Sequence, residues 1–372
     1  MNTPSNTSNS RKNILVTLVC VLIIGAGIYW FSQTRTSKVI DNIGADYNRG
    51  NLDSAIAEAE NLLAKNPNNI QALLAIASAY AQKGSLTFKE EENAKKAIEY
   101  ADRALALDSK NSEAFRIKGY ANEIQELYSE AHSNYNKAIE YDPKNSQAYS
   151  NKGHAYDLEG NIVEAEKLYV KAIEVSPSND HALLNLGRLY IRQEKFESAR
   201  TTLDSLLSSS PNNRMKGEAY QLLSYIYYNE ENFDAALEAI KSGLDFDPNM
   251  STAWVTKAKI ELGTALDMGT QEELDALIKQ VKEDLDKALA INPNQAEAYL
   301  TFSEIEIITG DRAKELDFRD KALQAIPLDI TLGKAEKEAM KRYIESQIKI
   351  TNSSSMPPES GTQSETVTEE AI

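Results

Sequence analysis

A proline, or a serine in its place, returns along this chain at a nearly constant spacing. The positions concerned are Pro67, Ser109, Pro143, Pro177, Pro211, Pro248, Pro293 and Pro327. Four of the seven intervals are 34 residues, and the other three are 42, 37 and 45 residues. A fixed period in this range is typical of a solenoid of stacked supersecondary units, because one unit cannot bury its hydrophobic face alone. The period therefore predicts a repeat array instead of one ordinary compact domain of 372 residues.

The side chains follow the same period. If each unit is numbered so that its proline is position 32, small residues recur at positions 8, 20 and 27, and position 8 is Gly119, Gly153 and Gly187 in three consecutive units. Large aromatic residues recur at positions 4, 11 and 24. Small residues let two helices approach closely, aromatic residues fill the remaining space, and proline stops the second helix of each unit. We expect the longer intervals to contain loop insertions, near residues 85–92 and 263–280.

This pattern resembles the tetratricopeptide repeat family, whose unit is a helix–turn–helix of 34 residues. The resemblance covers residues 38–327 as about eight units. It implies an all-α chain that forms a right-handed superhelix, or α-solenoid, with an extended concave surface. Residues 328–349 read as one more amphipathic helix, and we expect it to cap the open end of the array.

An apolar run of 18 residues without a charge, residues 14–31, predicts one transmembrane helix, preceded by a polar tail (1–13) and followed by a short linker (32–37). A cleaved signal peptide fits less well, because the run is long and no small-residue cleavage site follows it. The protein is expected in a membrane as a single-pass protein, in the cytoplasmic membrane if it is bacterial. Arg11 and Lys12 precede the run and Arg35 and Lys38 follow it, so the side of the repeat domain stays open.

The net charge of −16 argues against nucleic-acid binding, which relies on basic surface. The final segment, residues 350–372, is rich in Ser and Thr and carries four Glu and no base. It has almost no large apolar side chain to offset the entropy of ordering, so we expect an acidic disordered tail.

The family resemblance also implies that the first helix of each unit lines the concave groove. The residues that we expect to bind a peptide there are Arg116, Tyr120, Asn151, His154, Asn185, Arg188, Arg192, Tyr225 and Tyr228. Arg can bind a carboxylate through two hydrogen bonds, and an Asn amide can both donate to and accept from a peptide backbone. The groove-lining positions also include Glu113, Glu218 and Gln221. The predicted partners are proteins, through extended or acidic peptide segments. Alternatively, the Arg and Asn side chains are ordinary solvated surface.

No catalytic motif accompanies the repeats. The three histidines (His132, His154 and His181) lack a metal-ligand spacing, Cys20 is the single cysteine, and no nucleotide-binding loop occurs. We expect His132 to be solvated, no cofactor or metal to bind, and no enzymatic activity. The function predicted from the sequence is a membrane-tethered scaffold or adaptor for partner proteins, possible roles being cell-envelope complex assembly or secretion. The alternative is a non-catalytic regulatory subunit that recruits or controls an enzyme.

Overall fold

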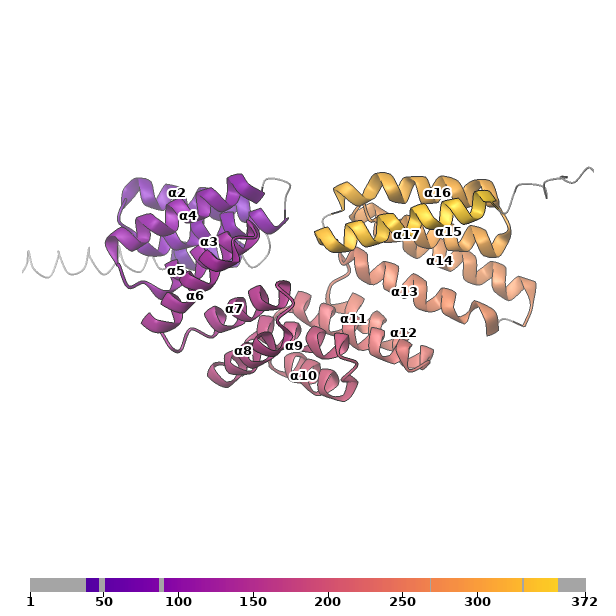
Figure 1. The fold of residues 1–372 in the computed structure, drawn as a ribbon, viewed down its shortest axis with the longest axis horizontal. Coiled ribbons are helices and arrows are strands. Elements are labelled where there is room, and N and C mark those ends of the chain that lie inside the picture. The colour runs from indigo at the N-terminus through magenta and orange to yellow at the C-terminus, as the bar shows by residue number, and fades with distance from the viewer. Residues whose placement is uncertain (1–37, 47–50, 87–89, 268, 330, 354–372) are drawn as a thin grey trace, which may run out of the picture. The chain divides into compact units, whose positions relative to one another are not determined.

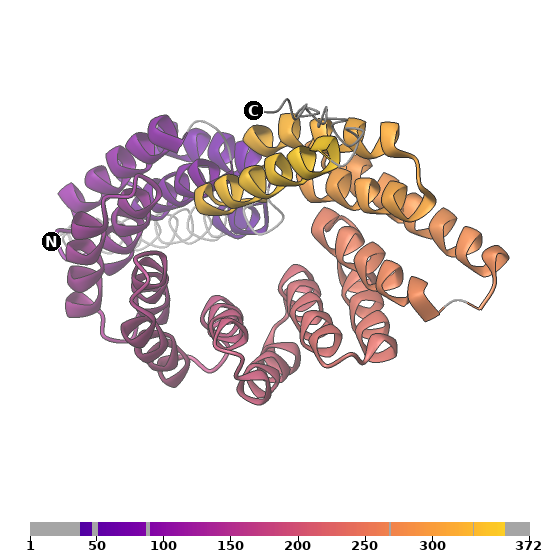
Figure 2. The same ribbon diagram turned by 45° about the vertical axis from the view of Figure 1, so that its right-hand side comes forward.

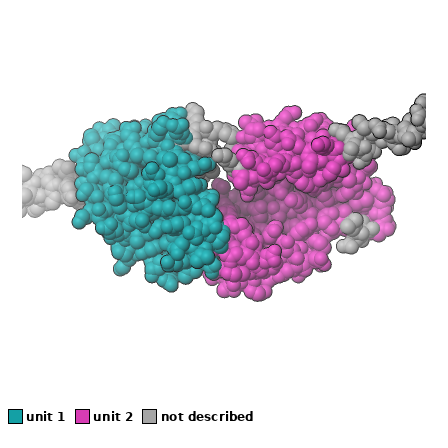
Figure 3. Space-filling model, in the orientation of Figure 1, with its two compact units in different colours: residues 1–186 teal, residues 187–372 magenta. Residues whose placement is uncertain are grey.

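The computed structural model of the chain describes residues 38–46, 51–86, 90–267, 269–329 and 331–353. Within these residues every regular element is a helix and no strand occurs (Figures 1 and 2). The helices fall into two compact units, residues 1–186 and 187–372, which Figure 3 shows in separate colours. The predicted all-α solenoid of repeats is confirmed, whereas its right-handed superhelical path stays a prediction.

In the first unit, consecutive helices pack against one another in pairs. The chain begins this series with a helix at residues 38–46. The helices that follow are α2 (Leu52–Lys65), α3 (Ile70–Leu86), α4 (Glu90–Leu107), α5 (Ser112–Ile124), α6 (Tyr128–Tyr141), α7 (Ser146–Leu158) and α8 (Ile162–Val175). Helix α9 (Asp180–Arg192) begins in the first unit and ends in the second.

The second unit continues the same alternation. Its helices are α10 (Phe196–Ser209), α11 (Asn213–Asn229), α12 (Phe233–Phe246), α13 (Ser251–Gly263), α14 (Gln271–Ile291), α15 (Ala296–Thr309), α16 (Arg312–Ala325) and α17 (Lys334–Ser353), with two short 3-10 helices, η1 (Thr264–Asp267) and η2 (Ile326–Leu328). Helix α17 packs on α16 and buries Ile344 against Ala322 and Ala325. It therefore covers the apolar end of the last repeat, and it extends four residues past the boundary at residue 349 that the sequence suggests.

The small residues of the repeat lie where the sequence predicts, at contacts between helices. At positions 20 and 27 the alanines are almost fully buried: Ala55, Ala97, Ala131, Ala165, Ala199, Ala236, Ala104, Ala138, Ala172, Ala288 and Ala322. At position 8 the glycines face the residue at position 24 of the same unit. A Cβ atom on Gly119 would lie 2.5 Å from the Tyr135 ring, and one on Gly153 would lie 3.0 Å from the Tyr169 ring. Both rings are fully buried, so the backbone at Gly119 comes too close to its ring for a side chain, and the backbone at Gly153 leaves little room for one.

Local signals set the start of many helices and the turn inside each repeat. An Asn two residues after the proline position, as in Asn69, Asn111, Asn145 and Asn179, accepts a hydrogen bond from the third backbone N–H that follows it and thereby caps the next first helix. Inside the repeat, position 15 has a left-handed backbone: φ is 78° at Gly160 but 58° to 59° at Glu126, Glu194 and Glu231. Glycine adopts this backbone freely and glutamate does not, so three of the turns carry a conformational cost.

Two sequence predictions need correction. The long interval in the seventh repeat is not only a loop, because helix α14 has 21 residues where the neighbouring second helices have 14. In addition, the prediction that His132 is solvated is wrong. Its side chain is 16% exposed, its ring stacks on Tyr156, and its Nε2 lies 2.6 Å from a carboxylate oxygen of Glu159.

A cluster of charged side chains is buried in the seventh repeat. Lys257 on α13 donates to Glu261 at 2.6 Å and to Asp284 on α14, and Lys287 donates to the other oxygen of Asp284 at 2.7 Å. Burial raises the pKa of Glu261, and one of its oxygens, Oε2, is buried without a hydrogen-bond partner. Burial would also raise the pKa of Asp284, but the hydrogen bonds from the two lysines lower it overall. Glu261 occupies position 11, where four other repeats have tyrosine.

The predicted transmembrane helix, residues 14–31, lies outside the described residues, as do the flanking segments 1–13 and 32–37. Among the helices that the structure describes, none is long and apolar enough to cross a membrane. Most of the predicted disordered tail, residues 354–372, is also outside the described part of the chain.

Candidate peptide-binding surface

In the first unit, Arg116 is held by two neighbours on the first helices α5 and α7. Its Nε and Nη2 donate to the two carboxylate oxygens of Glu113 at 2.8 and 2.5 Å. Its Nη1 donates to the side-chain oxygen of Asn151 at 3.0 Å, in the amide orientation that also satisfies the Asn151 nitrogen. The Arg116 side chain is only 12% exposed. The structure thus brings together the two predicted residues Arg116 and Asn151, but it uses them to join consecutive repeats.

His154, on α7, is connected to the core. Its Nδ1 lies 2.7 Å from one oxygen of Glu123, and the other oxygen of Glu123 accepts a hydrogen bond from the Tyr135 hydroxyl at 2.8 Å. Glu123 and Tyr135 are buried, whereas the His154 side chain is 40% exposed. Burial raises the pKa of Tyr135 well above its usual value, and the charge of Glu123 raises it further. A line of hydrogen bonds therefore links the first-helix face to the interior of the third repeat.

The remaining predicted residues of the first unit are less exposed than the sequence suggests. Tyr120 is half-buried and packs against the apolar core of the first repeats. Asn185 is half-buried on α9. Only part of each of these two side chains is accessible to a ligand.

In the second unit, Arg188 pairs with an acidic residue of the next repeat. Its Nη2 donates to Glu218 on α11 at 2.7 Å, and the second oxygen of Glu218 accepts from Arg214 at 3.3 Å. Arg188 and Arg192 are both exposed. This pairing compensates part of the positive charge that the sequence predicts for this face.

A pocket of about 310 Å³ lies beside this ion pair, and three successive first helices line it. Its lining residues are Arg188, Glu218, Gln221, Leu222, Tyr225, Thr252 and Thr256. The Gln221 amide donates to the Thr256 hydroxyl at 3.0 Å and accepts from the Thr252 hydroxyl at 3.2 Å, so its polar groups are satisfied across α11 and α13. Tyr225, one turn further along α11, is 50% exposed. The pocket therefore offers an aromatic surface with few unsatisfied polar groups.

Tyr228 continues this surface along α11. It is 39% exposed, and its ring packs edge-to-face on Phe233 at 5.4 Å between ring centres. Lys259 on the neighbouring α13 pairs with Glu297 on α15 at 2.8 Å, which repeats the arrangement of Arg188 and Glu218 two repeats further along the array. Tyr225 and Tyr228 thus lie between two ion pairs that each join a first helix to the next one.

The site in the second unit differs from the sequence prediction in its chemistry. The prediction relied on arginines and gave Glu218 only as a groove-lining position. In the structure Glu218 pairs with Arg188 from the next repeat. The prediction missed Thr252 and Thr256, because a threonine on a helix carries no motif. Their spacing of four residues on a first helix is the signal that could have identified them. Among the residues that the structure describes, no group of three or more His, Cys, Asp and Glu side chains is placed to hold a metal ion.

Comparison with known proteins agrees with this geometry. The helix pairs that repeat about every 34 residues and bury small side chains define a helical-repeat solenoid. Four family models described as tetratricopeptide repeat match residues 45–87, 134–167, 158–217 and 217–250. The chain therefore contains tetratricopeptide repeats over residues 45–87 and 134–250.

Among characterised sequences, this chain is 32% identical over 114 residues to the protein O-mannosyl-transferase TMTC1 of Homo sapiens and 28% identical over 114 residues to that of Mus musculus. These matches cover 30% of this chain but only 12% and 11% of the two relatives. Two solved structures share the fold: the APC/C hetero-tetramer Cut9-Hcn1 (TM-score 0.59, 13% identity, 82% of this chain and 55% of that chain) and yeast Tom70 (TM-score 0.54, 18% identity, 82% and 59%). At these identities the likeness shows the fold alone.

Proposed function

We propose that this chain is a membrane-tethered, non-catalytic scaffold that binds an extended segment of a partner polypeptide along the first helices of its repeats. The observation that carries the proposal is the pocket beside Tyr225, to which α9, α11 and α13 all contribute. A surface that continues over successive helices suits an extended ligand, and exposed tyrosines are frequent centres of binding energy at protein interfaces.

The apolar run at residues 14–31 supports the membrane tether, because 18 uncharged residues are about long enough to span a hydrocarbon core. A tether confines the repeat surface to the plane of a membrane, where it would hold a partner near other membrane components. Cell-envelope assembly or secretion is a role of this kind. Extraction of the native membranes with alkaline carbonate tests the tether: we expect the protein to stay in the membrane pellet, and its release would contradict this part of the proposal.

A pull-down of the full-length protein in detergent tests the binding surface. The variant Arg188→Glu/Tyr225→Ala removes the aromatic side chain and reverses the neighbouring charge. Because both side chains are exposed, we expect the helices to stay folded and partner recovery to fall at least about tenfold, the effect of losing 1.4 kcal/mol of binding free energy.

The matched control is Lys241→Glu/Tyr343→Ala, which makes the same chemical changes at an exposed lysine of α12 and a tyrosine of α17 that is 49% exposed. We expect this control to recover partners as the unmodified protein does. If the Arg188/Tyr225 variant also retains every partner, the binding surface lies elsewhere. The identity of the recovered chains distinguishes a scaffold from a regulatory subunit, because a regulatory subunit would recover a catalytic chain.

A further inference from the structure

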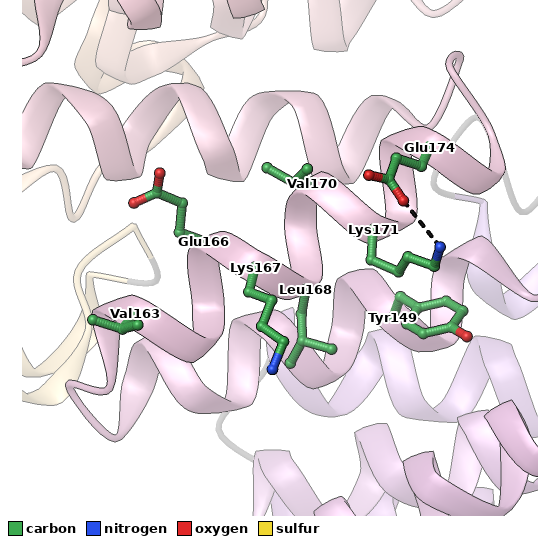
Figure 4. Close-up of a pocket in the computed structure, with 8 residues that line it drawn as sticks. All are labelled: Tyr149, Val163, Glu166, Lys167, Leu168, Val170, Lys171 and Glu174. Atoms are coloured by element: carbon green, nitrogen blue, oxygen red, sulfur yellow. Dashed lines mark hydrogen bonds and ion pairs between the residues drawn. The ribbon is translucent and has the colours of Figure 1, made fainter.

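A second surface lies on α8, the second helix of the fourth repeat, and it is separate from the first-helix pocket. It forms a shallow depression of about 710 Å³ (Figure 4). The residues that line it are Tyr149, Val163, Glu166, Lys167, Leu168, Val170, Lys171 and Glu174. Val163 is 76% exposed and Val170 is 38% exposed. The two valines therefore present exposed apolar surface on one face of α8.

The exposed side chains of α8 form one line. Val163, Lys167, Val170 and Glu174 are separated by four, three and four residues, the spacing that places side chains on one face of a helix. Figure 4 shows Val163 at one end of this line and Glu174, with Lys171 and Tyr149, at the other. The line therefore alternates apolar and charged side chains, beginning with the apolar Val163 and ending with the charged Glu174.

We propose that this line binds the same line of a second copy of the chain, with the two α8 helices antiparallel. A two-fold axis between Val170 and Lys171 leaves Lys167 and Glu174 equally far from the axis, on opposite sides. Each Lys167 then meets Glu174 of the second copy, and both ion pairs form at once. Val170 packs against its own counterpart, and Val163 reaches the end of the other helix where Tyr149 lies. Self-complementarity of this kind is what a two-fold interface requires.

The ion pairs within α8 do not oppose this association strongly. Lys171 contacts Glu174 at 2.9 Å and Lys167 contacts Glu164 at 3.4 Å, and the Lys167 and Glu174 side chains are 71% and 59% exposed. Exposed pairs of this kind contribute little free energy, so Lys167 and Glu174 can exchange partners. Since one helix face is smaller than a standard stable interface, we expect a dimer that dissociates on dilution, with a dissociation constant in the micromolar range.

Charge exchange tests the pairing, with sedimentation equilibrium of the full-length protein in density-matched detergent. Lys167→Glu places two acids opposite each other and Glu174→Lys places two bases opposite each other, so we expect either variant alone to be monomeric. An equimolar mixture of the two should form a heterodimer, and the double variant Lys167→Glu/Glu174→Lys should dimerise again. Lys241→Glu is the control and should leave the dimer intact. A monomeric unmodified protein at high micromolar concentration, or single variants that dimerise as it does, would overturn the proposal.

Disulfide trapping tests the antiparallel register independently. In a Cys20→Ser background, which removes the one native cysteine, Val170→Cys should give a covalent dimer on mild oxidation because the axis passes beside residue 170. Val163→Cys should not, because the two copies of residue 163 lie roughly 22 Å apart along the antiparallel helices at about 1.5 Å per residue. Efficient trapping at residue 163, or none at residue 170, contradicts the register.

Discussion

Adding one methyl group at Gly119 tests how tightly the repeats interlock. In Gly119→Ala the new Cβ would lie 2.5 Å from the Tyr135 ring, whereas ordinary contacts of this kind are 3.4 Å or longer. The ring would have to move by about 1 Å, and it is fully buried. Its hydroxyl also donates to the buried carboxylate of Glu123, which His154 contacts from the other side. The ring therefore cannot move without disturbing this line of hydrogen bonds.

Two effects set the magnitude. Replacing glycine by alanine in a helix stabilises it by roughly 0.5–1 kcal/mol. Overpacking a core costs about 1–3 kcal/mol, and weakening the hydrogen bond to buried Glu123 adds a cost of about 1 kcal/mol or more. We expect a net destabilisation of about 1–3 kcal/mol in the third repeat. Gly153→Ala should cost less, because its Cβ would meet the Tyr169 ring at 3.0 Å.

Hydrogen exchange of the backbone amides measures this loss repeat by repeat. The expected loss of free energy corresponds to a decrease in the protection factors of the α5 and α6 amides of roughly tenfold to a hundredfold. Since each repeat contacts only its neighbours, α15 and α16 should keep their protection. Gly44→Ala is the control: nothing lies within 4 Å of its Cβ position, so it should be neutral or slightly stabilising. If the amides of α5 in Gly119→Ala exchange as slowly as in the unmodified protein, the close packing of Gly119 on Tyr135 is contradicted.

Three further predictions concern charges and turns. Asp284→Asn should destabilise the second unit by about 3 kcal/mol in thermal or chemical unfolding, the lower end for a broken buried ion pair, because the buried ammonium of Lys257 loses one of its two carboxylate partners and keeps Glu261. The folded-state pKa of Glu261 is raised, so its contribution to stability is fully present below the usual pKa of glutamate and is lost as pH rises through the raised value. Glu261→Gln should therefore flatten the decrease in unfolding free energy with rising pH, which a pH series of unfolding measurements will show. Glu231→Gly should stabilise the sixth repeat by up to about 1 kcal/mol, because φ there is 59°, and amide exchange in α11 and α12 should slow accordingly.

The sequence predicts the helix pairs and their buried positions well, because small residues at a fixed period have one physical use. Alanine at position 20 and glycine at position 8 are needed only where helices touch, and both are buried. The period cannot predict which side chain faces which across two repeats. Arg188 and Glu218 are 30 residues apart, and no short motif signals that they pair across α9 and α11. Similarly, the 45-residue interval shows that residues were inserted but not that α14 would lengthen to hold them.

The compensated charges on the first-helix face bear on the kind of partner it can bind. A carboxylate ligand would have to replace Glu218 at Arg188, so the exchange would break one existing ion pair to form another and would yield little net free energy. Exposed ion pairs contribute little in any case, whereas burying an exposed aromatic side chain contributes free energy that nothing in the unbound protein offsets. Tyr225 and Tyr228 are half-exposed and lie between the ion pairs. The charged pairs on either side would then align the peptide, and the tyrosines would supply most of the binding free energy. A partner that presents an apolar side chain between polar neighbours matches this surface better than a purely acidic segment does.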